Sequence, residues 1–438
     1  MPGTPIDLSA EIVLRWDRPA PEHVTLFTEG GITAVWLAQR DERMNQACAA
    51  AGIRVLAPGD VRLLKSEQLE SAGDRSAVVV KDGTWSGATS GARQETVVAG
   101  ATARPWVEAN GFRVGYLRAL YPEMRPVLGY QMDEEAGVKP GKPPALSSLE
   151  LALIEAWVAG GNYVLSLTPE HQQALIEGRA EARTAWRNLG RTARWLRGNI
   201  ALFRQPTLPN ITMLVESGET TAELASLMYR QNASPRLIRA ADLAAAPPAA
   251  SDPGNDARQR CRVLVTAGIR PPNAKLRARI LAYAEAGATV VTDSYGEDAW
   301  WRAGACKLAR AFEDREFYAL GRGRLVAYKE EIQDPGDFAL DVLDLAGPER
   351  AVRLWDYGAI IALGTSAPAG GGAKAVLSAV NYGHPIRFDL LAQMHGQFNE
   401  ATLLRPDAKA LKLRVARRGP NSEVVLPNVN LLAVVVFT

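Results

Sequence analysis

AVLSAV at residues 375–380 and LLAVVVF at residues 431–437 are two apolar runs near the carboxyl terminus of this chain. Residues 381–385 read NYGHP, which is turn chemistry and predicts a connection to another strand. Residues 386–390 and 411–415 alternate between apolar and polar side chains, the period of half-buried strands. The final run is best explained as a strand docked in a sheet, because a free apolar end would be adhesive. Together they predict a small C-terminal β-sandwich over residues 346–438.

The composition is that of a folded chain without a charged partner surface. Hydrophobic residues make up 47% and charged residues 22% of the 438 positions, which excludes a disordered chain. At roughly 150 residues per domain, this length predicts about three domains. The net charge of +2 gives no reason to expect nucleic acid or an anionic membrane as a partner. The densest basic stretch, residues 179–197, has arginines at helical spacing and is interpreted as a solvated helix face.

The cysteines and the chain's ends carry little information about function. Cys48, Cys261 and Cys306 are scattered, so we expect neither a disulfide framework nor a CxxC metal site. The sequence also lacks GxxxxGK(S/T) and HExxH motifs, and no cofactor is expected. No run of about eighteen apolar residues predicts a transmembrane helix. The first residues lack a basic region followed by an apolar stretch, so we expect either a cytoplasmic protein or a secreted one without its signal.

The first 206 residues alternate short apolar runs with amphipathic segments, as parallel strands joined by helices do. Strands are predicted at 12–16, 32–37, 53–57, 77–80, 96–99, 127–130, 163–167 and 200–203. Helices are predicted at 22–29, 44–51, 106–120, 148–159 and 172–195. Eight strands in about 200 residues fit a compact (β/α)8 barrel of the TIM type. An open doubly wound sheet gives the same alternation, but the turn at 17–21 lacks the glycines of its dinucleotide-binding form.

Acidic residues follow several of these strands, and in a barrel the active site lies at the carboxyl ends of the strands. They are Asp17, Asp41, Glu42, Asp60, Asp82, Asp133, Glu134, Glu135 and Glu170. Asp82 and the consecutive acids Asp133, Glu134 and Glu135 are predicted to be catalytic, because mutually repelling carboxylates are easier to explain at a working site. A solvated loop is the alternative for these four, and helix capping is the alternative for Asp17, Asp60 and Glu170.

Aromatic rings occur at the same level of the predicted strands: Trp16, Trp36, Trp85, Trp106 and Tyr130. Carboxylates flanked by rings suit sugars, because one acid protonates the leaving oxygen and a second carboxylate attacks or activates water, while rings stack on the sugar. Trp16, Trp85, Trp106 and Tyr130 are therefore predicted to bind substrate. Core packing is the alternative for each tryptophan.

A second α/β unit is predicted over residues 207–345. Strands are predicted at 211–215, 236–238, 263–266 and 289–292, and helices at 221–231 and 274–286. The pattern is typical of a flavodoxin-like or glutamine-amidotransferase-like layer. Cys261 precedes its strand rather than occupying a strand-to-helix elbow, so this layer is predicted not to be catalytic.

This order of parts resembles that of clan A glycoside hydrolases, particularly the beta-galactosidases of family 42. The segments that carry the resemblance are 105–111, 380–383, 396–398 and 434–437. The resemblance implies a carbohydrate substrate, catalysis by two carboxylates and a substrate-binding role for Asn110 in the first segment. The chain departs from the family, which has an Asn-Glu pair after strand four and a Glu after strand seven. Here Asp82 stands at the first place and Glu170 near the second.

Three functions stay open at this point. The first is hydrolysis of O-glycosidic bonds by two carboxylates. The second is a non-catalytic glycan-binding or scaffold protein, with the middle layer as a contact in a homo-oligomer. The third is a small-molecule enzyme acting through the middle layer, which needs a pocket there. Two rim carboxyls about 5 to 9.5 Å apart across one cleft favour the first.

Overall fold

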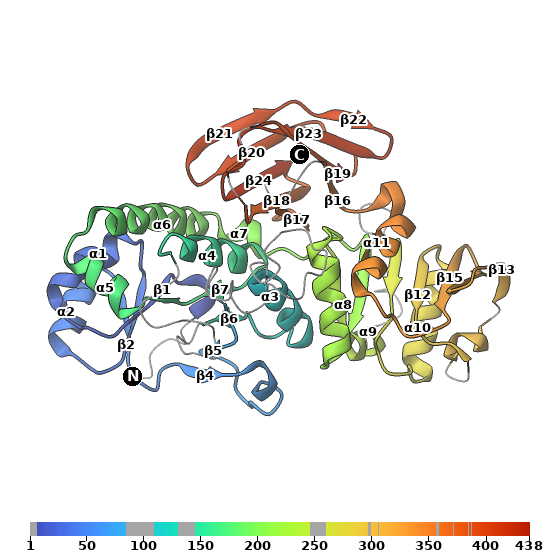
Figure 1. The fold of residues 1–438 in the computed structure, drawn as a ribbon, viewed down its shortest axis with the longest axis horizontal. Helices are drawn as coiled ribbons and strands as arrows, with labels where there is room; N and C mark the ends of the chain where they lie inside the picture. The colour runs from blue at the N-terminus through green and yellow to red at the C-terminus, as the bar shows by residue number, and fades with distance from the viewer. Residues whose placement is uncertain are drawn as a thin grey trace. The chain divides into compact units, whose positions relative to one another are not determined.

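The computed structural model describes residues 7–84, 109–129, 145–245, 260–296, 299–304, 306–355, 359–370, 372–383, 385–386 and 388–438. These residues form two compact units (Figure 1). The first unit comprises the described residues up to Arg204 together with Arg405–Lys409, and the second comprises the remaining ones. Among the helices of these ranges, none has the length and apolar character needed to cross a membrane.

The first unit contains two parallel sheets of four strands each. Its strands are β1 (Val13–Trp16), β2 (Ala34–Leu37), β3 (Arg54–Leu56), β4 (Arg62–Leu64), β5 (Val78–Val80), β6 (Val127–Leu128), β7 (Asn162–Tyr163) and β8 (Leu165–Ser166). One sheet has the order β3-β2-β1-β8 and the other β4-β5-β6-β7. The predicted parallel α/β pattern is confirmed for this part of the chain.

The two sheets meet in one stretch of chain, residues 162–166. Tyr163 pairs with Leu128 of β6, and Leu165 pairs with Leu14 of β1. Between them the amide of Val164 donates a hydrogen bond to the carbonyl of Leu128 at 2.8 Å. The strands therefore follow one another in space in the same cyclic order as in the chain, with β3 and β4 at the ends of the series.

One apolar cluster takes members from both sheets. It consists of Leu8, Val13, Ala34, Leu56, Val61, Val79, Val127 and Val164. Because successive side chains of a strand point to opposite faces, this cluster fixes the face of each strand that is interior. The two sheets thus enclose a shared core.

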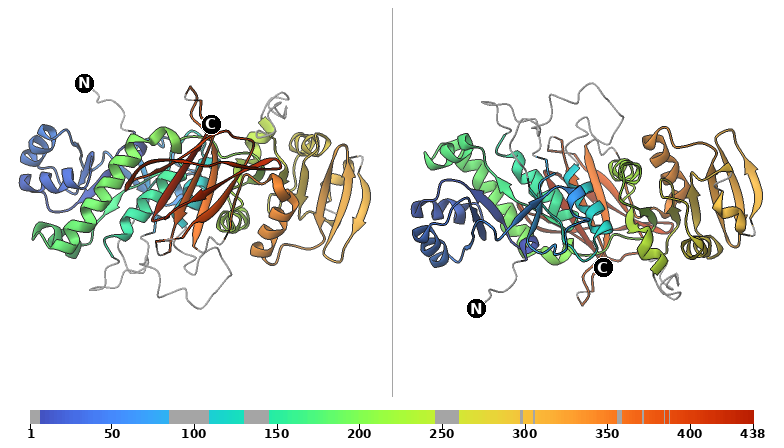
Figure 2. Two further views of the ribbon diagram at one scale, coloured as in Figure 1. Left: turned by 90° about the horizontal axis from the view of Figure 1, so that it is seen from above. Right: turned by 90° about the horizontal axis from the view of Figure 1, so that it is seen from below.

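The helices of this unit are α1 (Val24–Glu29), α2 (Glu42–Ala50), α3 (Ala109–Leu120), α4 (Ser148–Val158), α5 (Pro169–Ile176), α6 (Ala180–Gly198) and α7 (Ile200–Phe203). The long helix α6 packs against α1, α4 and α5, as Figure 2 shows. Its buried face carries Trp186, Leu189, Ala193 and Leu196.

Three sequence predictions for this unit are wrong. Residues 200–203 form helix α7 instead of a strand. Asn199 lies between α6 and α7, and its backbone carbonyl accepts the N–H of Leu202 at 2.9 Å, which begins the new helical turn. The predicted helix at 172–195 is two helices, separated at Gly178, whose φ of +73° ends the first. Strand β4 was not predicted, since it has three residues and none of them is buried. The predicted strand at 96–99 lies outside the described residues.

Helix α6 holds the carboxyl end of α1. The indole Nε1 of Trp186 donates to the carbonyl of Leu26 at 2.7 Å, and Nη1 of Arg194 donates to those of Thr28 and Glu29 at 3.1 and 3.2 Å. The carbonyls of Leu26 and Thr28 also accept the N–H groups of Gly30 and Gly31 at 3.0 and 3.1 Å, so the bonds from α6 add a second donor to these two carbonyls and give the carbonyl of Glu29, in the last turn, a donor. The predicted solvated arginine face is thus partly a structural one.

The second unit begins with a seven-stranded sheet of order β10-β9-β11-β12-β15-β14-β13. Its strands are β9 (Ile211–Val215), β10 (Arg236–Arg239), β11 (Val263–Val265), β12 (Thr289–Thr292), β13 (Lys307–Ala311), β14 (Arg315–Leu320) and β15 (Gly323–Tyr328). The first five in this order are parallel, and β14 and β13 extend the sheet antiparallel. The antiparallel hairpin was not predicted from the sequence.

Helices cover both faces of this sheet. Helices α8 (Glu219–Arg230) and α11 (Pro335–Ala346) pack together, as do α9 (Ala240–Ala245) and α10 (Ala274–Glu285). Leu214, Leu264 and Val290 share a core cluster with α9 and α10. Their neighbours in the strands are also buried and face α8 and α11, because side chains alternate along a strand.

Two antiparallel sheets complete the second unit, with orders β16-β19-β23-β22 and β17-β18-β24-β20-β21. Their strands are β16 (Val352–Leu354), β17 (Ile360–Ser366), β18 (Ala375–Asn381), β19 (Leu390–His395), β20 (Ala401–Arg405), β21 (Ala408–Leu413), β22 (Ala416–Arg418), β23 (Asn421–Leu426) and β24 (Leu432–Phe437). Both sheets contribute to one apolar core. The predicted terminal strand is confirmed as β24, which lies between β18 and β20. The alternation at 386–390 was a weaker guide, because the strand begins only at Leu390.

The edge strand β17 is capped by side chains from the loop after α8. The side-chain amide of Asn232 accepts from the backbone N–H of Ala362 at 2.6 Å and donates to the carbonyl of Ile360 at 3.0 Å. The hydroxyl of Ser234 accepts from the N–H of Gly364 at 2.9 Å. Asn232 and Ser234 therefore take the place of a neighbouring strand at this edge, which would otherwise expose unpaired backbone groups.

Candidate functional site: a hollow at the carboxyl ends of the strands

A hollow lies directly above the apolar cluster of the first unit. Each of six cluster residues is followed two positions later by a residue that lines it: Val13 by Arg15, Ala34 by Trp36, Val61 by Leu63, Val79 by Lys81, Val127 by Gly129 and Val164 by Ser166. Two residues along a strand advance about 7 Å on the same face. The hollow is therefore the next layer of the interior, toward the carboxyl ends of parallel strands.

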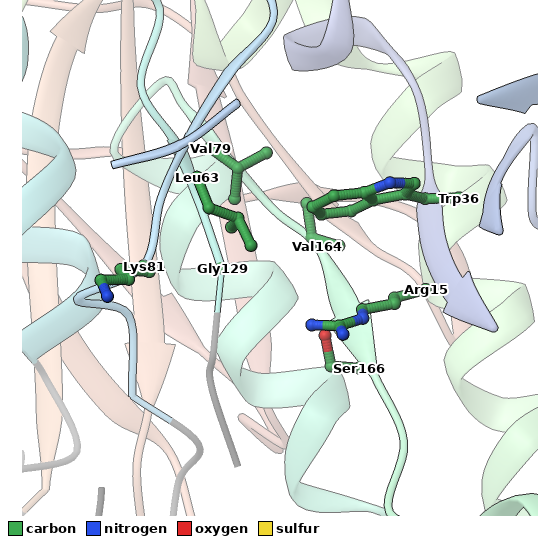
Figure 3. Close-up of a pocket in the computed structure, with 8 residues that line it drawn as sticks. All are labelled: Arg15, Trp36, Leu63, Val79, Lys81, Gly129, Val164 and Ser166. Carbon is green, nitrogen blue, oxygen red and sulfur yellow. The ribbon is translucent and has the colours of Figure 1, made fainter. Parts of the chain in front are cut away.

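The hollow is small and open to solvent, and about 250 Å³ of empty space, solvent included, lies between its lining residues. Leu63, Val79 and Val164 form its apolar part, while Arg15, Trp36 and Ser166 gather on one side and Lys81 on the other (Figure 3). A floor of aliphatic side chains with polar groups above it is typical of a site for a small ligand.

Arg15 and Trp36 form one side of the hollow. They are register partners on β1 and β2, and the guanidinium carbon of Arg15 lies 5.6 Å from the centre of the Trp36 ring. The Nε of Arg15 is 3.7 Å from the carboxylate of Asp17, two positions further along. Because only this edge of the guanidinium meets Asp17, the guanidinium can still bind a second anionic group.

Ser166 and Lys81 supply two further polar groups. Ser166 is a register partner of Arg15 and only 4% exposed. Figure 3 shows the guanidinium of Arg15 directed toward the Ser166 hydroxyl. Among the residues that the structure describes, the Lys81 amine and the Ser166 hydroxyl have no hydrogen-bond or ionic partner. Both groups are therefore available to a ligand.

Asp82 does not line this hollow. Its carboxylate accepts the backbone N–H of Ser66 at 2.6 Å and lies 3.6 Å from Nη1 of Arg113 on α3. The neighbouring Lys81 lines the hollow, so alternation directs Asp82 to the outer face. The additional strand β4 also makes Asp82 follow the fifth strand of the chain and not the fourth. The position matched to the family 42 acid is therefore displaced.

Trp16 and Asn110 are also placed away from the hollow. Trp16 is fully buried, its Nε1 donates to the carbonyl of Arg18 at 2.6 Å, and its ring packs edge-on against Phe27 of α1. Asn110 is 1% exposed, and its amide bonds both the N–H and the carbonyl of Thr84, at 2.8 and 2.9 Å. These contacts fit the core-packing alternative for Trp16 and give Asn110 a role in positioning the chain after β5.

Six other residues that were predicted from the sequence to belong to the site cannot be placed. Trp85, Trp106, Tyr130, Asp133, Glu134 and Glu135 lie outside the described residues. They stay predictions.

Several rim carboxylates are engaged by local backbone. Asp41 accepts the N–H of Met44 at 2.7 Å at the start of α2, and Asp60 accepts the N–H of Ala57 at 2.7 Å. Glu170 lies in the first turn of α5, where its own backbone N–H and the Thr168 hydroxyl hold the pKa of its carboxyl below the ordinary value. Asp41 and Glu170 fit the capping role, whereas Asp60 holds the turn between β3 and β4.

Arg15, Lys81 and Ser166 were not predicted from the sequence, because the candidates were acids and aromatic rings near the strand ends, whereas these three are neither. The side chains that reach the hollow are in register with the buried cluster instead, two positions after an interior residue. A signal was present in the sequence. Val13, Val79 and Val164 are each followed two positions later by a polar residue, which faces the same side of the strand. Within the described ranges, no three His, Cys, Asp or Glu side chains come together to form a metal site.

The middle layer offers no activated thiol. Burial raises the pKa of the Cys261 thiol to about 12, more than its hydrogen bonds with Thr212 offset. Burial also raises the pKa of Cys306, the other thiol of this layer, and in the first unit it raises the pKa of Cys48 on α2 to about 11. At the carboxyl ends of β9 and β11, where doubly wound sheets bind ligands, the Glu216 carboxylate is bonded by the backbone and guanidinium of Arg270 at 3.1 and 3.0 Å.

We expect Cys261 to react with iodoacetamide at pH 8 at least about 100-fold more slowly in the native protein than in urea, because the thiolate is the nucleophile. Peptide mapping by mass spectrometry after a short alkylation pulse measures this rate. The urea-unfolded chain is the control. Rapid labelling of native Cys261 would contradict the assignment and reopen catalysis by this layer.

Comparison with known proteins places the fold. No protein-family model and no curated protein matches the chain. A beta-galactosidase from Bacillus circulans sp. alkalophilus superposes with a TM-score of 0.50 at 9% identity, over 99% of this chain and 100% of that chain. The chain is similar in structure to beta-galactosidases. The resemblance to glycosidases inferred from the sequence is thereby confirmed, as a likeness of fold.

Two further solved structures give similar values. A beta-galactosidase from Rahnella sp. R3 has a TM-score of 0.49 at 10% identity, over 90% of this chain and 66% of that chain. A GH42 beta-galactosidase from G. stearothermophilus has 0.46 at 9% identity, over 75% of this chain. The match spans 57% of that enzyme's length.

Proposed function

We propose that this chain is a glycoside hydrolase whose active site is the hollow above the Val13 cluster. In this proposal residues 1–206 form a parallel (β/α)8 barrel that closes on itself. Residues 207–345 form an amidotransferase-like layer, whose five parallel strands have the flavodoxin-like order 2-1-3-4-5. Residues 346–438 form a β-sandwich.

The observation that carries the proposal is the layering of the hollow on the cluster. Strands from both sheets contribute side chains to one cluster and then, two positions later, to one cavity. Side chains from all around a barrel stack in such layers, and active sites lie above the last layer at the carboxyl ends. The beta-galactosidase fold, which covers 99% of the chain, is consistent with this architecture.

The catalytic carboxylates are proposed to come from Asp133, Glu134 and Glu135. Gly129 lines the hollow, and Asp133 is the fourth residue after it. Four residues span at most about 14 Å, so these three acids are within reach of a ligand in the hollow. One acid would protonate the glycosidic oxygen while a second carboxylate attacks the sugar or activates water. Asp82 is proposed to position the chain after β5 through Ser66 and Arg113.

The test is a panel of aryl glycosides assayed with the full-length chain and with Asp133→Asn, Glu134→Gln, Glu135→Gln and Asp82→Asn. We expect turnover of at least one glycoside. Substitution of a general acid or base lowers the rate about 100- to 10,000-fold. At least one of the variants at positions 133–135 should therefore lose about 100-fold or more in kcat. Asp82→Asn should stay within about fivefold, and circular dichroism checks its fold.

Two results would overturn this assignment. A folded Asp82→Asn variant without activity, beside three active cluster variants, moves the acid to Asp82. The second is binding of a glycan without turnover of any glycoside.

That second result would support the alternative of a non-catalytic glycan-binding or scaffold protein. One observation favours it: none of the described residues lining the hollow carries a carboxylate. In this reading Trp36 stacks on a sugar and Arg15 and Ser166 bond its hydroxyl groups. Saturation-transfer NMR with unmodified oligosaccharides detects such binding directly.

A further inference from the structure

We infer that the hollow recognises an acidic saccharide, one that carries a carboxylate or sulfate group, rather than a neutral sugar. This inference rests on the proposed function, because it names the substrate class of the same site. The sequence led us to expect an acidic rim. The described part of the wall carries Arg15 and Lys81, with Asp17 beside Arg15, while the predicted acids Asp133, Glu134 and Glu135 lie outside the described residues.

The polar groups of the wall are arranged around one place. Arg15 and Ser166 are neighbours in register across β1 and β8, and Arg15 is also in register with Trp36 on β2. A guanidinium presents parallel N–H donors that match the two oxygens of a carboxylate or sulfate. The Ser166 hydroxyl adds a donor beside them. Arg15 on β1 and Ser166 on β8 thus place hydrogen-bond donors side by side for an oxyanion, next to Trp36 on β2.

Trp36 gives the same place affinity for a sugar ring. The indole is partly exposed and lines the hollow 5.6 Å from the guanidinium carbon of Arg15. An indole face stacks on the apolar face of a pyranose, and the charged substituent of an acidic sugar lies at the rim of that ring. A ring stacked on Trp36 would therefore bring its anionic substituent within reach of Arg15.

Lys81 lies on the opposite side of the hollow, and Figure 3 shows its amine directed away from the other lining side chains. Its amine makes no ion pair with any described residue. Asp17 offsets one of the two positive charges, and it contacts Arg15 at Nε only. Counting Arg15, Lys81 and Asp17 alone gives a charge of about +1, and in this inference the anion is held by its direct contact with Arg15 rather than by the net charge of the site.

Matched pairs of substrates test the inference. The full-length chain is assayed with 4-nitrophenyl glycosides that differ only at C6, as hydroxymethyl, carboxylate or sulfate ester, in the gluco and galacto series. We expect an acidic member to have a KM at least about 10-fold lower than its neutral counterpart, the effect of one charge-assisted contact. The carboxylate and sulfate arms show which oxyanion the site takes.

Variants assign the effect to the wall. Arg15→Gln and Lys81→Met should raise the KM for the acidic member about 10-fold or more relative to the KM for the neutral one, so that the preference for the acidic member is lost. Lys65→Gln is the control, because Lys65 follows β4 and pairs with Glu67 at 3.9 Å on the surface. If Arg15→Gln lowers kcat equally for neutral and acidic members, the cations position the catalytic carboxylates and the inference fails.

Calorimetry with free uronic acids and sulfated monosaccharides separates this inference from the proposed function. Binding of an acidic sugar, lost in Arg15→Gln, together with no turnover of any glycoside, supports the acidic site and rejects the hydrolase. Turnover of neutral glycosides with no preference for acidic ones supports the hydrolase and rejects the acidic site.

Discussion

Gly190→Ala is expected to lower the free energy of unfolding of the first unit by about 4 kcal/mol or more, the range of severe core defects. A Cβ built on Gly190 overlaps the carbonyl oxygen of Glu29 and lies 2.9 Å from the Cα of Gly30. Both obstacles are backbone and cannot rotate away. Relieving them would separate α6 from the end of α1 and stretch the bonds that Trp186 and Arg194 make to it.

Gly198→Ala is the matched control in the same helix. Nothing lies within 4 Å of a Cβ at Gly198, and alanine favours helix over glycine by up to about 1 kcal/mol. This variant should be as stable as the parent or slightly more stable. Urea denaturation followed by circular dichroism measures both. Equal stability of the two variants would show that α6 and α1 do not approach each other as closely as described.

Asn232→Ala is expected to cost about 3 kcal/mol in the second unit. The substitution leaves the N–H of Ala362 and the carbonyl of Ile360 without their partner at a buried edge, at about 1–3 kcal/mol for each group. Asn232 also has a φ of +60°, which alanine adopts less readily than asparagine. Thermal unfolding of the full chain, monitored by calorimetry, reports the loss as a lower Tm of the second unit.

Asn232→Gly separates the two causes, because glycine adopts positive φ without strain but has no amide. It should recover the strain component and still be less stable than the parent. Gln231→Ala tests an adjacent side chain that makes no hydrogen bond within the described residues, and it should be nearly neutral. An Asn232→Gly variant as stable as the parent would falsify the edge-capping role of the amide.

Local patterns carried much of the fold. Uniformly apolar runs such as Ile211–Val215 and Thr289–Thr292 became buried strands with the predicted bounds, because burial on both faces leaves a continuous apolar signal. Residues 307–328 became an antiparallel hairpin extension that the sequence did not reveal. Every residue of β13 is exposed, so its strand depends on pairing with β14 and leaves no apolar periodicity.

The site was harder to predict than the fold, for a geometric reason. A residue near the end of a strand faces the interior if it lies an even number of positions from a core residue, and the exterior if that number is odd. The sequence alone does not show which residues are in the core. Asp82 and Trp16 are one position out of register with the interior, whereas Lys81 and Arg15 are in register. Short strands such as β5, with three consecutive valines, give no alternation from which the register could be predicted.

The shared stretch 162–166 has a consequence for how the first unit is made. It alone joins the sheet of β1–β3 to that of β4–β6 among the described strands, and it pairs Leu14 with Leu165 across some 150 residues of chain. Contacts this distant in sequence slow folding. During synthesis the early strands would emerge long before their closing partner, with their apolar interior faces uncovered. This unit is thus the part of the protein with most need of protection by chaperones before residue 166 leaves the ribosome.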